Sequence, residues 1–309
     1  MDLLEVLTKR LESLPEGDYI PGLKAVVQHI NVATKHLQRG QASADETAFT
    51  DSIYRTNQAF EGSLKEAYRV LTGKNPAKET TNTIEQYLQG HNVLRERVLA
   101  QLTNYRRQWR NPSTHDYGLD FDEDEALLAI VNVSVFAIVL IDQIIERISF
   151  NKAKIVASES ASPSPPPLPL LEQVVLLLEQ FVYQFRGTHD DKMDRREPEI
   201  LGALSGFLSA TAPELFTASN DTINHHVNRP DFYLKSPENN EDLVIEVKLR
   251  RPSNSRMIED AAINQVISYM ETSGTDEAIV FVYVSGNSGR IGREERYIGK
   301  KKIVIVTTR

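Results

Sequence analysis

Two carboxylates and a lysine in the C-terminal half, Asp231, Glu246 and Lys248, have side chains suited to chemistry on phosphate esters. Side chains alternate across a β-strand, so Glu246 and Lys248, two positions apart, are expected on one strand face at a spacing of ~6–7 Å. Asp231 follows Pro230 at the start of the preceding apolar run, and antiparallel pairing of the two runs would bring it beside Glu246. Two carboxylates this close repel each other unless a cation lies between them, and such oxygen ligands suit Mg2+ or Mn2+.

A divalent cation held by Asp231 and Glu246 would favour phosphodiester hydrolysis. The ion lowers the pKa of a bound water, polarises the phosphate and stabilises the leaving oxygen, while Lys248 helps to position or deprotonate the water. The three residues therefore predict a metal-dependent catalytic centre with Asp231 and Glu246 as the metal ligands. An E-x-K triplet alone is a weak signal, because alternation in an ordinary strand also places a polar pair on a solvated face.

The surrounding elements indicate an α/β domain. Helices are expected at 171–185 and 198–210, and short apolar strands at 231–234, 243–249, 278–284 and 303–307. The first two strands flank SPENNED, a segment rich in turn residues, so they predict a β-hairpin. A helix at 257–272 lies between the second and third strands.

Pro230-Asp231 followed by Glu246-Val247-Lys248 resembles the PD-(D/E)xK motif of the restriction-endonuclease superfamily. The likeness covers residues 171–309 and implies an endonuclease sandwich fold, Mg2+ dependence and DNA as the substrate. The family often carries an acid on the first helix and a Q-x3-Y motif on the helix after the hairpin. Here the matching residues are Glu197 or Glu199, between which the sequence leaves the choice open, and Gln265 with Tyr269.

Other polar residues of this half have two interpretations each. His225 and His226 have no role in the resemblance and are typical of a surface loop. A basic cluster near the C-terminus would follow a phosphate backbone near the site or form a solvated hairpin. Its members are Arg290, Arg293, Arg296, Lys300, Lys301 and Lys302, interrupted by Glu294 and Glu295.

Composition supports two domains. A chain of 309 residues with 40% apolar residues is long enough for two cores. The Ser/Pro-rich segment 156–170 is typical of an extended linker and divides a domain at 1–155 from one at 171–309. Cysteine is absent and the N-terminus lacks the order of a signal peptide, so a cytoplasmic location is expected. The net charge of −8 argues against an extensive basic nucleic-acid surface.

The N-terminal domain is expected to be an all-helical bundle, because its apolar residues recur every three and four positions. The apolar stretch 126–145 follows an acidic run suited to a helix N-terminus and is interpreted as a buried core helix rather than a membrane span. Arg110, Asn111, His115 and Tyr117 lie close together in YRRQWRNPSTHDYG. Arg110 could stabilise phosphorane charge and His115 move the proton of a ribose 2′-hydroxyl, so the pair could cleave RNA without metal.

Arg110-x4-His115, with Asn111 after the arginine and Tyr117 two positions past the histidine, resembles the R-x4-6-H signature of HEPN domains. The likeness covers about residues 40–150, including a helix at 59–71 that carries Glu61. It implies a homodimer in which two motifs form one cleft. Related domains also serve as dimerisation or sensing modules, so ribonuclease activity and an assembly role both stay open.

Two functions from different classes follow. The first is a nuclease effector that combines both domains. By family resemblance, this pairing suggests a protein of prokaryotic defence against phage or plasmid. The second is a nucleic-acid-binding or assembly module whose sites have lost their chemistry. The intact set of Asp231, Glu246 and Lys248 favours the first.

Overall fold

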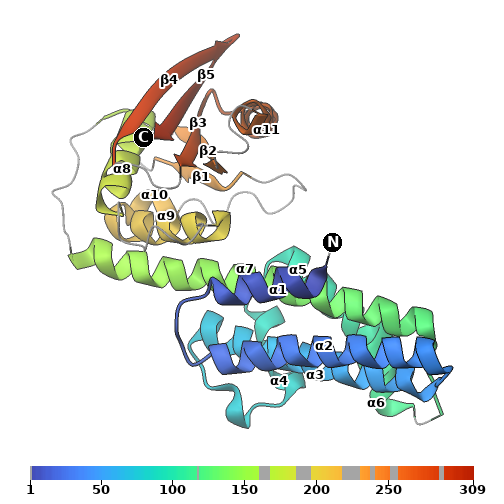
Figure 1. The fold of residues 1–309 in the computed structure, drawn as a ribbon. Helices are drawn as coiled ribbons and strands as arrows, with labels where there is room; N and C mark the ends of the chain where they lie inside the picture. Colours follow the sequence, from blue (N-terminus) through green and yellow to red (C-terminus); the bar gives the residue numbers. More distant parts are fainter. Residues whose placement is uncertain are drawn as a thin grey trace. The chain divides into compact units, whose positions relative to one another are not determined.

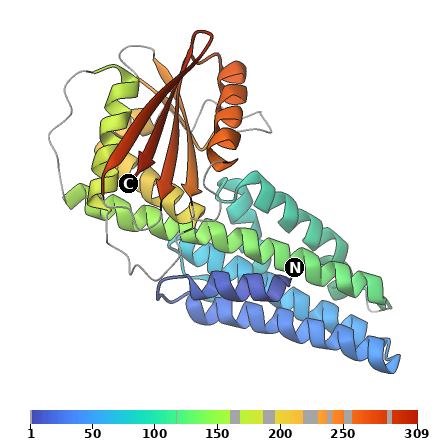
Figure 2. The ribbon, with the colours of Figure 1, turned by 45° about the horizontal axis from the view of Figure 1, so that its top comes forward.

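The computed structural model describes residues 2–116, 118–159, 168–185, 196–217, 230–236, 241–250, 257–284 and 289–309, apart from the side chains of Arg97 and Met257. The chain divides into two compact units, Met1–Arg147 and Ile148–Arg309. The first is helical and the second contains a mixed five-stranded sheet (Figures 1 and 2), in agreement with the predicted two-domain organisation. The division falls within one long helix, α7 (Glu123–Glu159).

The N-terminal unit is a bundle around a long helical hairpin, α2 and α3. Phe60 of α3 stacks on Tyr105 at 4.7 Å between ring centroids and packs against Phe136 of α7 at 5.2 Å, which forms an aromatic centre for the bundle. Its elements are α1 (Leu3–Glu12), α2 (Ile20–Ser43), α3 (Thr47–Thr72), the 3-10 turn η1 (Pro76–Lys78), α4 (Thr81–Gly90), α5 (Glu96–Tyr105), the π-helical turn η2 (Arg106–Arg110), α6 (Asn111–His115) and most of α7.

The π-helical turn η2 between α5 and α6 is explained by Pro112, two residues past its end. Pro112 has no backbone N–H and cannot donate to the carbonyl four residues earlier. The Asn111 N–H instead bonds to the carbonyl of Arg106, five residues earlier. The helix widens at this turn without breaking, so Arg106, Arg110 and His115 lie on one continuous helical segment.

Helix α7 is long and apolar enough to cross a membrane, judged by length and composition alone. However, 56% of its most apolar window is buried within the protein, as in a core helix. Its first turn carries Glu123, Asp124 and Glu125, which stabilise a helix N-terminus. These features agree with the predicted core helix and give only weak support for a membrane span.

The C-terminal unit is built around a sheet with the strand order β1-β2-β3-β5-β4. The central strands β2, β3 and β5 are parallel, and β1 and β4 pair with them antiparallel at the two edges. The strands are β1 (Phe232–Lys235), β2 (Asp242–Arg250), β3 (Glu277–Val284), β4 (Ile291–Ile298) and β5 (Lys301–Thr308). The helices of this unit are α8 (Leu170–Gln184), α9 (Glu197–Thr211), α10 (Pro213–Thr217) and α11 (Met257–Ser273), preceded by the end of α7.

Helices cover both faces of the sheet, so the unit has two cores. Ile245 and Val247 of β2 pack with α8 and α9 on one face, whereas Val244 packs with α11 on the other. Figure 2 shows α11 on the side of the sheet opposite α8. The last turns of α7 add Ala153 and Ala157 to the α8–α9 core.

Candidate functional site

Strand pairing brings Asp231 beside Glu246. Phe232 pairs with Ile245, so the same register places Asp231 opposite Glu246. Oδ2 of Asp231 accepts a 2.7 Å hydrogen bond from the backbone N–H of Val247. This contact holds the aspartate immediately before β1, as expected from the hairpin predicted for these residues.

Glu246 and Lys248 lie on the sheet face covered by α11, because they alternate with Ile245 and Val247, which pack under α8 and α9. Nζ of Lys248 donates a 2.6 Å hydrogen bond to Oε1 of Glu246. The other oxygen, Oε2, is buried without a hydrogen-bond partner in the described part of the chain. Glu246 is only 3% exposed and pairs across the sheet with the apolar Val280. A buried carboxylate thus has one oxygen without a side-chain or backbone partner that meets hydrogen-bond geometry among the described residues.

The surroundings disfavour the charged forms of both acids. Burial, followed by the charge of Glu246, raises the pKa of Asp231 to about 7. Burial also raises the pKa of Glu246, although the hydrogen bond and charge of Lys248 oppose the rise. Burial lowers the pKa of Lys248, but the hydrogen bond and charge of Glu246 outweigh it and raise that pKa overall. The two carboxylates therefore share a site with more negative charge than one lysine offsets.

Of the two candidate acids on α9, Glu197 acts on this centre. Its charge raises the pKa of Asp231 and of Glu246, although burial is the larger cause for both. Glu197 is the first residue of α9, whereas Glu199 is two positions on and roughly 200° further round the helix. The choice between Glu197 and Glu199 stays a prediction, and the charge of Glu197 on Asp231 and Glu246 favours Glu197.

The donor set fits a hard divalent cation. Among the residues that the structure describes, no three of His, Cys, Asp and Glu gather as a complete protein cage for a metal ion. Mg2+, however, is usually bound through one or two carboxylates, with water and substrate phosphate as its other ligands. Asp231 and Glu246 supply two carboxylates, and Oε2 of Glu246 is a buried acceptor that a cation would satisfy.

The Q-x3-Y residues lie on α11. Gln265 is exposed, while Tyr269 is half-buried and packs against the core between α11 and the sheet, on the face that carries Glu246 and Lys248. Three further residues singled out from the sequence lie outside the described residues: His225, His226 and Tyr117.

Most of the basic cluster is engaged within the protein. Arg293 binds Glu172 of α8 and Glu295, both at 2.6 Å. Lys302 pairs with Glu295, Arg296 with Glu294 and Lys301 with Glu271. These internal pairs favour the interpretation of β4 and β5 as a solvated hairpin.

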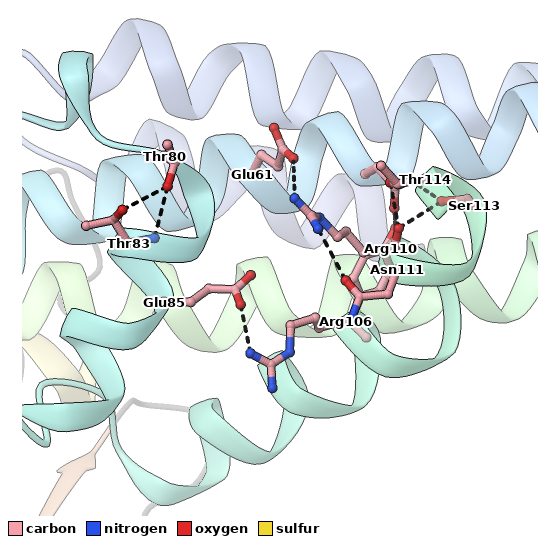
Figure 3. A network of polar contacts seen from close by, with 11 residues as sticks. Glu61, Thr80, Thr83, Glu85, Arg106, Arg110, Asn111, Ser113 and Thr114 are labelled. Atoms are coloured by element: carbon pink, nitrogen blue, oxygen red, sulfur yellow. Dashed lines mark hydrogen bonds and ion pairs between the residues drawn. The ribbon is translucent and has the colours of Figure 1, made fainter. Parts of the chain in front are cut away.

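Arg110, the arginine of the R-x4-H motif, lies in a polar network of the N-terminal unit (Figure 3). Nη1 of Arg110 donates to Oδ1 of Asn111 at 3.2 Å, and Nη2 lies 3.7 Å from Oε1 of Glu61 on α3. One turn earlier, Arg106 binds the buried carboxylate of Glu85 at 3.0 Å. Nε of Arg110 is buried and lacks a hydrogen-bond acceptor among the described residues.

His115 does not share this network. It is the exposed last residue of α6, five positions after Arg110. At 3.6 residues per turn, this spacing separates the two side chains by roughly 140° around the helix. Within the described part of one chain, no hydrogen bond or ion pair joins them. The structure therefore places Arg110 and His115 on one element without bringing them together.

Sequence reasoning missed the residues that hold this turn in place. Asn57 of α3 donates to Ser113 Oγ at 2.7 Å, and Ser113 Oγ donates to the Arg110 carbonyl at 3.2 Å. The buried hydroxyl of Tyr105 donates to Asn57 Oδ1 at 3.0 Å and to Thr56 Oγ1 at 2.7 Å. The one available signal was Asn57, a polar residue four positions before Glu61 and so on the same α3 face.

Compared with protein-family models, curated proteins and solved structures, the chain matches none.

Proposed function

We propose that the C-terminal unit is a divalent-metal-dependent endonuclease of the PD-(D/E)xK type that hydrolyses DNA phosphodiester bonds. The observation that carries the proposal is the buried carboxylate of Glu246. One of its oxygens binds Lys248 and the other has no partner among the described residues, while Asp231 lies opposite in the hairpin. A buried carboxylate oxygen is costly to leave unsatisfied, and a cation is the partner that would satisfy both acids at once.

Each residue then has a distinct task. Asp231 and Glu246 would hold Mg2+ or Mn2+, and the ion would supply an activated water and charge neutralisation at the phosphate. A bound cation would favour the ionised form of Asp231, whose pKa burial raises to about 7. Lys248 keeps Oε1 of Glu246 in place and positions the water. Glu197 contributes further negative charge beside these acids. Gln265 and Tyr269 of α11 are proposed as supporting residues on the resemblance alone.

A second activity is proposed for the N-terminal unit: metal-independent RNA cleavage by a HEPN-like homodimer. The buried Nε of Arg110 favours it, because this donor has no acceptor in the described structure and suits a phosphate oxygen. Asn111 orients the guanidinium, and His115 would move the proton. The alternative is a unit that only dimerises or senses a ligand. The pair of activities fits a cytoplasmic effector of prokaryotic antiviral or anti-plasmid defence.

Cleavage of supercoiled plasmid tests the DNA proposal. Wild-type protein should nick the plasmid with Mg2+ or Mn2+ and not with EDTA. Glu246→Gln, which keeps the shape of the side chain and removes its charge, should lower the rate by about 100-fold or more. Glu271→Gln on the exposed surface of α11 is the matched control and should cut normally. Full activity of the Glu246 variant, or no cleavage by the wild type with either ion, contradicts the proposal.

A further inference from the structure

Strand register gathers three arginines into one row at the end of the sheet. Arg250 of β2 pairs with Val284 of β3. Val282 pairs with Thr307, so two residues further the same register places Val284 opposite Arg309. The backbone N–H of Arg309 donates to the carbonyl of Arg290 at 2.8 Å, which completes the row.

This row lies on the same face of the sheet as the candidate metal centre. Lys248, Val282, Thr307 and Gly292 form the row two positions before it. Because side chains two positions apart share a face, Arg250 continues the face of Lys248 by one step. Three interstrand distances of ~4.8 Å separate β2 from β4, so the row extends ~14 Å away from the centre.

Gly292 leaves space for the side chain of Arg309. A Cβ atom at Gly292 would lie 2.4 Å from Nε of Arg309, so the missing side chain leaves room for this guanidinium over the strand. Arg309 therefore folds back towards the row of Lys248. Arg290 is exposed, and Arg250 donates to Glu259 at 2.8 Å, which fixes its side chain and engages one of its five N–H donors.

The other cations of the β4–β5 hairpin do not extend this row. Arg293, opposite Val306, lies mid-strand on the other face of the sheet, where it binds Glu172 of α8. Lys301 and Lys302 lie at the far end of the sheet. Lys302 pairs with Glu277, the first residue of β3, whereas the arginine row lies at the last residue of that strand. The hairpin tip, with the exposed Lys300, is thus separated from the arginine row by the length of the strands. Among the described cations of the β4–β5 hairpin and β2, those of the arginine row continue the face of Lys248.

We propose that Arg250, Arg290 and Arg309 bind the phosphates of a DNA substrate to one side of the bond that is cut. The inference rests on the proposed DNA-cleaving function and adds the direction in which the substrate runs. Phosphates advance 3.4 Å per nucleotide along the axis of one strand, so a row of ~14 Å spans about four steps. Arginine suits such contacts because its planar fork donates two hydrogen bonds to one phosphate.

Fluorescence anisotropy with a labelled DNA duplex tests the row. Binding is measured with Ca2+ in place of Mg2+ to suppress cleavage, over a series of salt concentrations. Arg290→Ala/Arg309→Ala should weaken binding by about tenfold or more, and it should reduce the slope of log K against log salt by about two, one for each lost phosphate contact. Gly292→Ala should also weaken binding with no change in charge, because the new Cβ displaces Arg309. Lys300→Ala, an exposed cation at the other end of the sheet, is the control and should stay within twofold of the wild type.

The outcomes separate the two proposals. If the wild type cuts DNA and the double variant binds it normally, the arginine row is overturned and the nuclease proposal stands. If the wild type binds DNA through the row without cutting it in Mg2+ or Mn2+, the row is supported and the nuclease proposal fails. A wild type that neither binds nor cuts DNA overturns both.

Discussion

The carboxylate of Glu246 accepts a 2.6 Å hydrogen bond from Lys248 through one oxygen and buries the other without a described partner. The lysine thus has a structural task besides the proposed chemical one. It supplies the cation that Glu246 needs in the metal-free protein. Removal of the lysine and removal of the glutamate should therefore have different effects on stability.

Lys248→Ala should lower the rate of DNA cleavage by at least ~100-fold, because it removes the group proposed to act on the water. In EDTA it should also destabilise the protein by roughly 3 kcal/mol, since Glu246 then stays buried without a countercharge. Mn2+ should recover part of that loss by replacing the missing cation. Plasmid cleavage and urea unfolding with and without Mn2+ measure these effects.

Lys301→Ala is the control for this variant, because its ion pair with Glu271 is long at 3.8 Å and largely exposed on the glutamate side. It should change neither cleavage nor stability measurably. Normal cleavage by purified Lys248→Ala protein would remove the lysine from the catalytic set.

Asp231→Asn should stabilise the metal-free protein in a pH-dependent way. The pKa of Asp231 is about 7 in the folded protein, against 3.8 for an unperturbed aspartate. A raised carboxyl pKa means that the folded state binds the proton more tightly, so wild-type stability falls as pH rises from about 4 to about 7 and then levels off. The amide lacks this penalty, and its oxygen can still accept from Val247.

Thermal unfolding in EDTA at pH 5.5 and pH 8 measures the effect. The gain in Tm of the asparagine variant over the wild type should be larger at pH 8. At pH 8, Mn2+ should raise the Tm of the wild type and leave the variant less affected. An equal gain at both pH values would show that burial of the charged form is not what destabilises the site.

The hairpin centre could be predicted from the sequence because its geometry follows from local rules. Alternation along β2 sets the shared face of Glu246 and Lys248, and the antiparallel register of β1 with β2 brings Asp231 opposite Glu246. Strand β4 was not predicted. Its sequence, IGREERYI, is largely exposed and lacks the apolar run by which a buried strand is recognised, so only pairing with β5 defines it.

The Arg110 network could not be predicted for a different reason. Asn57 and Ser113 are 56 residues apart in the chain, and their contact depends on how α3 packs against η2 and α6. The expected closeness of Arg110 and His115 was a matter of sequence spacing alone. The continuous helix through η2 and α6 turns them to different sides.

Tyr105→Phe should weaken the N-terminal unit by about 1–2 kcal/mol. The substitution keeps the aromatic stacking on Phe60 and removes only the hydroxyl, which leaves the buried acceptors on Thr56 and Asn57 without their donor. The midpoint of the urea transition, followed by circular dichroism, measures the loss. Tyr54→Phe removes a hydroxyl from a tyrosine that is 52% exposed and should leave the midpoint unchanged. Equal midpoints for all three proteins would show that the Tyr105 network adds no stability.

Arg110 and His115 are expected to act together across two copies of the chain. They lie roughly 140° apart on one helical segment, so a catalytic pair within a single copy is disfavoured. Two copies arranged with their motifs in one groove would pair the Arg110 of one copy with the His115 of the other. We therefore expect wild-type protein to be a dimer by light scattering and to cleave RNA in EDTA. Arg110→Ala and His115→Ala homodimers should each be inactive on RNA.

A purified heterodimer of these two variants, made by co-expression with two different tags, decides between the arrangements. If the pair forms between copies, one intact Arg110 faces one intact His115, and about half of the wild-type RNA cleavage should return. If the pair forms within one copy, each chain lacks a member and the heterodimer stays inactive. Both single variants should still cut DNA with Mn2+, because Asp231 and Glu246 use a cation and do not require the 2′-hydroxyl. A monomeric wild type without RNA cleavage in EDTA would contradict the ribonuclease proposal and leave the helical unit a role in sensing or binding.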